Sequence, residues 1–361
     1  LFGDVGRSGD WREGVITSWV NGLRDSTNPW IVFEGPLDGL SDAFVPLFSS
    51  DRKLVKSNGD VHFMPPNTSL IIETDSLARA TPGLLSKAFL VNFDDESLTW
   101  FALFERFLSR FPPMGPSESA SVSVFLHAVL APLFAFAQGQ RNLLGPFRDN
   151  VVAYRILKIT KALFRPFELG PTTKVTSEKE LRVALVNALL FATVWAVGSL
   201  FPENSRRLFD SNVKKMLTNC DKSVPAEVAK LFTRVTFPEK DLLFDHRLSL
   251  TCGLENGRRS FASEWVAWPV ENSGALLPRH GVVLALSDLM LNARRSVLVV
   301  GADASGKSRL MKEVAKRKNA LVLNSVRTQV HGAFAAYFER CTRQKLAPVV
   351  VVDDLALPTN T

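Results

Sequence analysis

The feature that most constrains this chain is an apolar run, residues 297–300, that leads into the pattern Gly-x-x-x-x-Gly-Lys-Ser. Loops of this pattern wrap a phosphate in backbone N–H groups, while the lysine reaches the terminal phosphates and the serine hydroxyl ligates Mg²⁺. The helix that follows points its positive N-terminal end at the same anion. We therefore predict a strand, a phosphate-binding loop and a helix, with ATP or ADP and Mg²⁺ as ligands. The candidate nucleotide-binding residues are Gly301, Ala302, Asp303, Ala304, Ser305, Gly306, Lys307 and Ser308.

Hydrophobic periodicity on both sides of this loop predicts alternating helices and strands. The expected elements are helix 281–292, strand 296–300, a helix from the loop to about residue 318, strand 321–324, helix 328–345 and strand 349–352. This is the order of a parallel sheet with right-handed crossovers and helices on its faces. A doubly wound sheet needs further strands, so we expect this domain to continue beyond residue 361.

The last expected strand ends in two acids, Asp353 and Asp354. In phosphate-loop ATPases the first acid of such a pair holds Mg²⁺ and the second polarises the attacking water. Asp353 is therefore a candidate metal ligand together with Ser308, and Asp354 is a candidate catalytic residue. Asp354 is shorter than the glutamate that usually acts as base, and Asp303 places a carboxylate inside the loop. We therefore expect nucleotide binding more firmly than hydrolysis; the alternative for the acid pair is a solvated turn.

Composition argues against several other kinds of protein. The net charge of +7 comes from dispersed basic residues, which favours a solvated surface over a nucleic-acid-binding face. The three cysteines and five histidines lack metal-ligand spacing. The stretch 183–201 is almost long enough to span a bilayer, but Asn187, Gly198 and the lack of a second such stretch favour a buried core helix. The chain begins without Met or a secretory signal, so we expect a piece of a longer protein.

The chain consists of three segments with different sequence patterns, called regimes below. Residues 1–97 alternate short apolar runs with turns, as α/β units do. Residues 98–272 show helical periodicity and predict an all-helical body, and residues 273–361 carry the phosphate loop. The predicted fold class is therefore α/β, with parallel sheets and flanking helices joined by a helical region. The strands and the hairpin turn expected in the first regime are 30–33, 69–72 and Asn58-Gly59.

Several phrases, in order along the chain, carry a resemblance to a known family. Those in the first regime are Trp11–Thr17, Trp30–Asp38, Ser57–Asp60, Ser69–Glu73 and Asp75–Lys87, and those in the second are Phe191–Gly198, Arg206–Asp210, Phe237–Lys240, Leu243–Leu248 and Trp265–Trp268. The first set resembles the second AAA+ module of a dynein heavy chain. The second set is similar to that module's helical lid and to the passage into the third module. The phosphate loop and residues 351–358 resemble the third module's nucleotide motifs, as found in the axonemal branch.

The resemblance implies P-loop AAA+ modules joined by a helical lid. Residues 1–97 would be the later part of the second module, 98–272 its lid and linker, and 273–361 the first half of the third. They would belong to a six-module motor ring that converts ATP turnover into stepping along microtubules, with the third-module site binding ATP or ADP and Mg²⁺ to regulate motility.

The same resemblance implies partners and a location. The implied partners are the neighbouring modules, the dynein intermediate and light chains and, through regions outside these residues, microtubules. Neither nucleic acid nor membrane is expected as a partner. The implied location is the cytoplasm and cytoskeleton, in the axoneme of a cilium or flagellum.

Departures from the family pattern bear on activity. Lys87 stands where the second module presents an arginine to the nucleotide of the first, which makes it a candidate catalytic residue of a neighbouring site. Lysine lacks the two-pronged guanidinium, so we expect weaker activation; the alternative is an ordinary surface lysine. Glu34 ends the equivalent strand of the first regime, but Gly35 follows where a second acid is needed. Two other functions stay open: a nucleotide-independent structural ring segment, and another giant AAA+ protein such as midasin.

Overall fold

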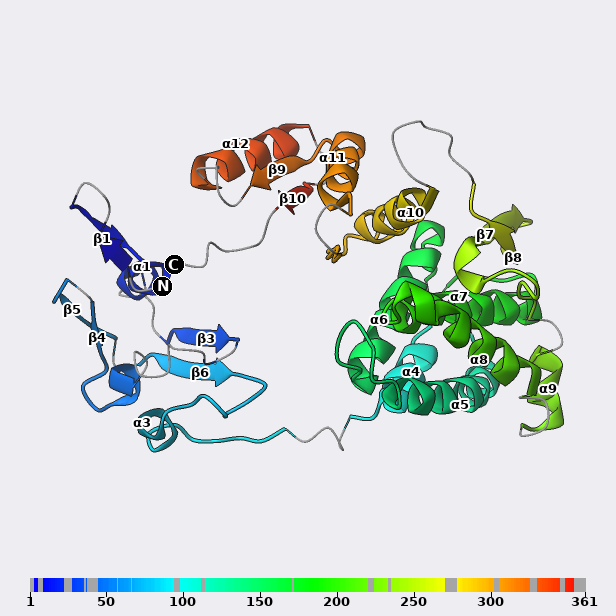
Figure 1. Ribbon diagram of the computed structural model, residues 1–361, viewed down its shortest axis with the longest axis horizontal. Coiled ribbons are helices and arrows are strands. Elements are labelled where there is room, and N and C mark those ends of the chain that lie inside the picture. The colour runs from blue at the N-terminus through cyan, green and yellow to red at the C-terminus, as the bar shows by residue number, and fades with distance from the viewer. Residues whose placement is uncertain are drawn as a thin grey trace. The chain divides into compact units, whose positions relative to one another are not determined.

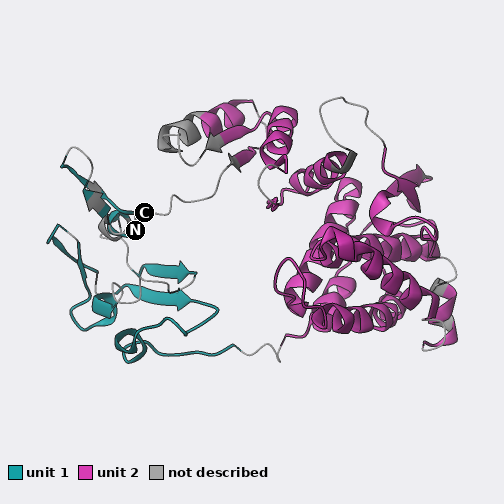
Figure 2. Ribbon diagram, viewed as in Figure 1, with its two compact units in different colours: residues 1–94 teal, residues 95–361 magenta. Residues whose placement is uncertain are grey.

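The computed structural model divides the chain into two compact units, residues 1–94 and 95–361, which are described in turn (Figures 1 and 2). The structure describes residues 3–5, 9–22, 28–35, 37, 45–56, 58–65, 67–93, 98–111, 114–170, 172–219, 224–232, 235–269, 278–301, 305–324, 330–344 and 348–353.

Short strands surround a small apolar core in the first unit. β3 (Trp30–Glu34) and β6 (Ser69–Glu73) pair in parallel, so that the acids ending the two strands lie opposite each other. This pair confirms both predicted strands. β4 (Lys53–Val55) and β5 (Val61–Phe63) form an antiparallel hairpin. The other elements are β1 (Gly3–Val5), β2 (Trp11–Glu13), α1 (Val15–Gly22), η1 (Val45–Phe48) and α3 (Pro82–Leu85). The buried core residues are Ile16, Ile31, Leu37, Leu47, Leu54, Met64 and Leu84.

The turn between β4 and β5 confirms the hairpin predicted from its Asn-Gly pair. Gly59 has a φ of +90°, a conformation that costs glycine little. The side-chain oxygen of Asn58 accepts a hydrogen bond from the backbone N–H of Asp60 at 3.1 Å. The backbone N–H of Lys56 donates to the carbonyl of Asp60 at 2.9 Å and closes the turn.

A buried lysine ties this hairpin to β2. Lys56 exposes only 3% of its side chain, and its Nζ lies 2.5 Å from Oε1 of Glu13 and 4.0 Å from Oδ2 of Asp60. The ammonium also lies 5.6 Å from the ring centroid of Trp11. A charge this deep needs such partners, because desolvation penalises it. The hydrogen bond from Lys56 holds the pKa of Glu13 below its ordinary value of 4.5.

The Glu13–Lys56 pair predicts a pH-dependent stability. Because the pKa of Glu13 is lowered on folding, its contribution is present above the pKa of the unfolded chain and is lost as pH falls through the lower folded value. We expect the chain to melt at a higher temperature than Glu13→Gln at pH 7, with the difference vanishing in acid. Thermal unfolding between pH 7 and 3 measures it. Asp51→Asn is the control, because the Asp51–Lys53 pair is exposed and contributes little; an equal effect of both variants would contradict the prediction.

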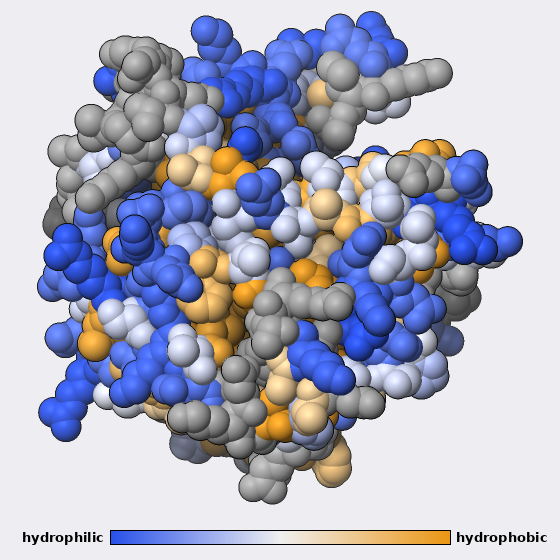
Figure 3. Space-filling model, turned by 90° about the vertical axis from the view of Figure 1, so that its right-hand side faces the viewer, coloured by the Kyte–Doolittle hydropathy of each residue, from blue (hydrophilic) through white to orange (hydrophobic). Residues whose placement is uncertain are grey.

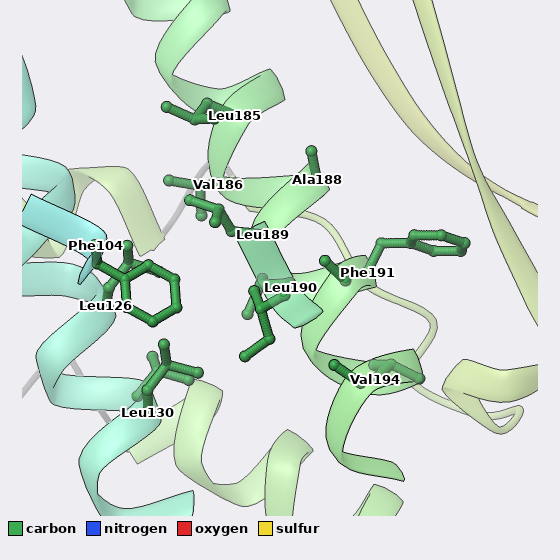
Figure 4. Packing of buried hydrophobic residues seen from close by; sticks show 14 of the residues in the cluster. Phe104, Leu126, Leu130, Leu185, Val186, Ala188, Leu189, Leu190, Phe191 and Val194 are labelled. Carbon is green, nitrogen blue, oxygen red and sulfur yellow. The ribbon is translucent and has the colours of Figure 1, made fainter. Parts of the chain in front are cut away.

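A helical body forms most of the described part of the second unit. Its helices are α4 (Trp100–Ser109), α5 (Pro116–Gln138), α6 (Asp149–Phe164), α7 (Glu178–Gly198), α8 (Arg206–Asn219) and α9 (Ala226–Phe232), with the short turns η3 (Arg165–Phe167), η4 (Glu203–Ser205) and η6 (Leu243–Asp245). α7 packs against α5 and α6. Phe104, Leu126 and Leu130 point toward its apolar side chains in Figure 4. Charged and polar residues cover much of the face in Figure 3, with smaller apolar patches between them.

Two helices of this body, α5 and α7, are long and apolar enough to cross a membrane by length and composition. The expectation of a single such stretch is therefore wrong, because serines in the first turns of α5 mask the apolar run that follows. In α7, 83% of the apolar window is buried inside the body, and in α5 50% is buried. Packing in the core therefore accounts for these apolar surfaces, most completely in α7.

The helical region also carries a long hairpin that its helical periodicity did not indicate. β7 (His246–Glu255) and β8 (Arg258–Ala267) pair antiparallel over their full length. Their turn is Asn256-Gly257, and both residues have positive φ, as a two-residue hairpin requires. α7 packs against both strands. The side-chain amide of Asn187, in the middle of α7, donates to Oγ of Ser263 on β8 at 2.9 Å.

Gly198, at the end of α7, lies where the surrounding side chains leave no room for a Cβ atom. A Cβ there would lie 2.4 Å from Cζ of Phe244 and 2.9 Å from Cε1 of Phe209, and both rings are buried. We expect Gly198→Ala to lower the free energy of unfolding by about 1–3 kcal/mol, as overpacking does. Gly281→Ala is the matched control, because Gly281 is helical with nothing within 4 Å of an added Cβ. Chemical denaturation compares the two; an unchanged stability of Gly198→Ala would refute the packing argument.

The C-terminal part of this unit alternates helix and strand as predicted, with one exception. β9 (Leu321–Asn324) and β10 (Val350–Asp353) pair in parallel, and the helices are α10 (Pro278–Asn292), α11 (Lys307–Lys318) and α12 (Val330–Arg343). The strand predicted at 296–300 does not form. Leu298 and Val300 are 76% and 82% exposed. This run pairs with neither β9 nor β10, and an apolar segment becomes a strand only where a neighbour accepts its hydrogen bonds.

Candidate nucleotide site

The phosphate loop ends at a helix start that is suited to an anion. Gly306 has a φ of +87° and is the N-cap of α11, and glycine has no side chain that could cap the first turn. The N–H groups of the first turn therefore have no partner from the cap residue. They carry the positive end of the helix dipole, which favours a negative ligand. Among the described loop residues, Lys307 and Ser308 occupy the first two positions of this helix.

A hydrogen bond between Lys307 and Gly301 joins the two ends of the loop. Nζ of Lys307 donates to the carbonyl oxygen of Gly301 at 2.7 Å, so the ammonium reaches across the loop. A Cβ on Gly301 would lie 3.1 Å from Oγ of Ser305, which shows how closely the two sides of the loop approach. The glycine positions and the basic side chain fit a phosphate. Ala302, Asp303 and Ala304 lie outside the described residues, so the orientation of Asp303 stays a prediction.

α10 packs along α11, the helix that follows the loop. Leu284 of α10 and Leu310 and Val314 of α11 are buried together. At the far end of α11, the carboxylate of Asp288 lies 3.2 Å from Nζ of Lys318 and 3.7 Å from Arg317. The helices on the two sides of the loop are therefore packed against each other.

Tyr337 of α12 anchors the start of β10. Its hydroxyl oxygen accepts a hydrogen bond from the backbone N–H of Val349 at 3.0 Å, and the hydroxyl donates to a carbonyl, either that of Val349 at 2.9 Å or that of Asn319 at 3.3 Å. Burial raises the pKa of this phenol. The anchor joins α12, the turn after α11 and the strand that ends in Asp353.

The structure brings together only part of the predicted site. Asp353 is the last residue of β10, which packs against α11, at the carboxyl end of a parallel strand pair where ligands bind in such sheets. Its side chain and the whole of Asp354 lie outside the described residues, so their roles stay predictions. Lys87 is exposed after α3 in the first unit, where its backbone N–H donates to the carbonyl of Leu84 at 3.1 Å. Glu34 lies opposite Glu73.

One residue at this site was missed by sequence reasoning. His280, in the first turn of α10, lies against Gly306, and its Nε2 is 3.2 Å from the carbonyl oxygen of Ser305. A single histidine on a helix carries no sequence signal for such a contact, because the contact depends on how α10 and α11 pack.

Comparisons with known proteins agree with this architecture. The profile of the family described as dynein heavy chain AAA lid domain matches residues 122–269, which include most of the helical body and the β7–β8 hairpin. The chain is 24% identical over 338 residues to dynein axonemal heavy chain 12 of Homo sapiens, covering 87% of this chain and 10% of that protein. It is 22% identical over 327 residues to dynein axonemal heavy chain 1 of Homo sapiens, covering 83% of this chain and 7% of that protein.

These matches extend along the chain. Similarity to dynein axonemal heavy chain 12 of Mus musculus covers 99% of this chain and 12% of that protein, at 22% identity. The chain therefore spans about a tenth of the length of these relatives. The α/β units with a helical lid define a stretch of AAA+ protein. The lid-domain match and the relatives along the chain support a divergent fragment of a dynein heavy chain.

The hydrogen bonds of Tyr337 should stabilise β10 against local opening. Tyr337→Phe leaves the N–H of Val349 without its partner, so we expect the opening free energy of β9 and β10 to fall by about 1–3 kcal/mol. Amide hydrogen exchange of peptides covering 321–324 and 348–353 measures this change. The chain's other tyrosine supplies the control, because Tyr154 is 52% exposed and Tyr154→Phe removes no buried partner. Equal exchange in both variants would contradict the anchor.

Proposed function

We propose that this chain is part of the AAA+ motor ring of a dynein heavy chain and that residues 301–308 bind ATP or ADP with Mg²⁺. The observation that carries the proposal is the helix start at Gly306, which has a positive φ, with Lys307 reaching across the loop. In a dynein heavy chain such a loop has a place in a ring of nucleotide-binding modules. We assign residues 1–97 to the later part of the second module, 98–272 to its lid and linker, and 273–361 to the start of the third.

The roles of the loop residues follow from their chemistry. Lys307 would exchange the Gly301 carbonyl for phosphate oxygens, since an anion is the stronger acceptor. Ser308 and Asp353 would hold Mg²⁺, which neutralises phosphate charge when bound. Asp354 is the residue we assign to orienting water. Its short side chain and the carboxylate of Asp303 favour a regulatory site that binds nucleotide and turns it over slowly, if at all.

Lys87 is proposed to act on a different site. It is exposed beyond α3, where an arginine of a ring neighbour would reach the nucleotide of the preceding module. A lysine supplies the charge without the bidentate fork, so its contribution there would be smaller than that of arginine.

Partners and location follow from the family. The proposed partners are the neighbouring modules of the same heavy chain, the dynein intermediate and light chains and, through regions outside these residues, microtubules. Because the relatives named above are axonemal dynein heavy chains, we propose the cytoskeleton of a cilium or flagellum as its place. The lid-domain match favours dynein over midasin. A structural ring segment that binds no nucleotide remains the alternative function.

Amide exchange of the loop tests nucleotide binding in the full heavy chain, where other modules also bind nucleotide. We expect Mg²⁺-ATP to protect peptides covering 301–310. Lys307→Ala should raise the ATP concentration needed for protection by about 10- to 100-fold, the factor for a lost charged hydrogen bond. Lys312→Ala, on the exposed side of the same helix, is the matched control and should leave the concentration unchanged. A loop that shows no protection in the unmutated chain would favour the structural segment.

A further inference from the structure

His280 contacts the phosphate loop at the peptide between Ser305 and Gly306. The carbonyl of Gly306 already accepts the first hydrogen bond of α11, from the N–H of Leu310 at 3.0 Å, so the peptide that follows Gly306 is held by the helix. Among the described residues, no backbone hydrogen bond holds the preceding peptide, between Ser305 and Gly306, in the same way. Glycine tolerates both signs of φ, so a glycine here would let that peptide turn over at little cost.

The imidazole of His280 supplies the missing restraint. Its Nε2 lies 3.2 Å from the Ser305 carbonyl oxygen, and a carbonyl only accepts, so Nε2 carries the proton and donates. The ring also covers Gly306, because a Cβ there would lie 2.9 Å from Cε1 of His280. Nδ1 is buried and has no hydrogen-bond partner, so the ring's one polar contact among the described residues is with the loop.

This hydrogen bond also determines where the backbone N–H of Gly306 points. In a planar trans peptide the N–H points opposite to the C=O. Holding the Ser305 carbonyl toward α10 therefore turns the N–H of Gly306 away from α10. If this peptide turned over, its carbonyl would replace the N–H on that side, and a carbonyl dipole repels an anion where an N–H attracts it.

We propose that His280 is a positioning residue that holds the Ser305–Gly306 peptide with its N–H free to bind phosphate. The proposal rests on residues 301–308 being a nucleotide site, as proposed above. The contacts of His280 in this structure are with the loop backbone at Ser305 and Gly306. We therefore expect it to tighten binding of any polyphosphate, whether or not a nucleoside is attached.

Two variants separate the donor from the bulk of the ring. His280→Leu keeps an apolar side chain over Gly306 but cannot donate, whereas His280→Gln retains an N–H donor. In the nucleotide-free full heavy chain, we expect amide exchange in peptides covering 305–310 to rise by up to about fivefold in His280→Leu, the factor for one lost hydrogen bond. The reporting amide is that of Leu310, which donates to the carbonyl of Gly306 and is exposed more often when the loop peptide is loosened. His280→Gln should stay near the unmutated chain. Peptides covering 312–318 report whether the helix itself remains folded.

Ligand titration supplies the second readout, with protection of the same peptides by Mg²⁺-ATP and by inorganic tripolyphosphate. We expect His280→Leu to weaken both by a similar factor of about five and His280→Gln to restore both. Unchanged exchange in His280→Leu, no rescue by glutamine, or weakened binding of ATP alone would each overturn the positioning role. If the unmutated chain binds neither ligand while exchange still responds to His280→Leu, the nucleotide site fails and the loop contact stands.

Discussion

Burial of α7 on nearly every face holds the helical body together. Its side chains from Leu181 to Val197 contact α5, α6 and the β7–β8 hairpin, so these elements bury their apolar surfaces against one helix. Apolar burial is non-directional, and it stabilises any arrangement that excludes water. The close fit of Gly198 beneath the rings of Phe209 and Phe244 and the single amide contact of Asn187 select one arrangement. The helical body therefore depends on the packing of one helix.

The phosphate loop depends on a different principle. A loop that binds an anion must keep its N–H groups free of internal partners, so the contacts that order it have to come from outside. In this chain they come from the two helices that flank it. Asp288 holds the far end of α11, the Leu284 cluster holds the middle, and His280 reaches the loop itself. The described part of the loop is therefore held by His280 of α10 and by its own hydrogen bond between Lys307 and Gly301.

Local patterns were sufficient for short apolar strands and for a hairpin with a distinctive turn. β3, β6, the Asn58-Gly59 turn and β9 were predicted from short apolar runs and turn residues. The β7–β8 hairpin was overlooked, although its Asn-Gly turn and its alternating apolar residues were readable signals. The run at 296–300 was predicted as a strand because it is apolar, yet pairing depends on a neighbour that no local pattern supplies.

By itself, the sequence indicated the resemblance to dynein heavy chains and the order of α/β units around a helical region, and it predicted the phosphate loop with its lysine and serine. These follow from residue types at short spacings, where backbone geometry and side-chain chemistry are local. Only the tertiary structure decided that Tyr337 anchors β10 and that His280 lies on Gly306. It also decided that Lys56 is buried beside Glu13. Each of these contacts joins residues far apart in the chain, and their meeting is set by how helices and strands pack.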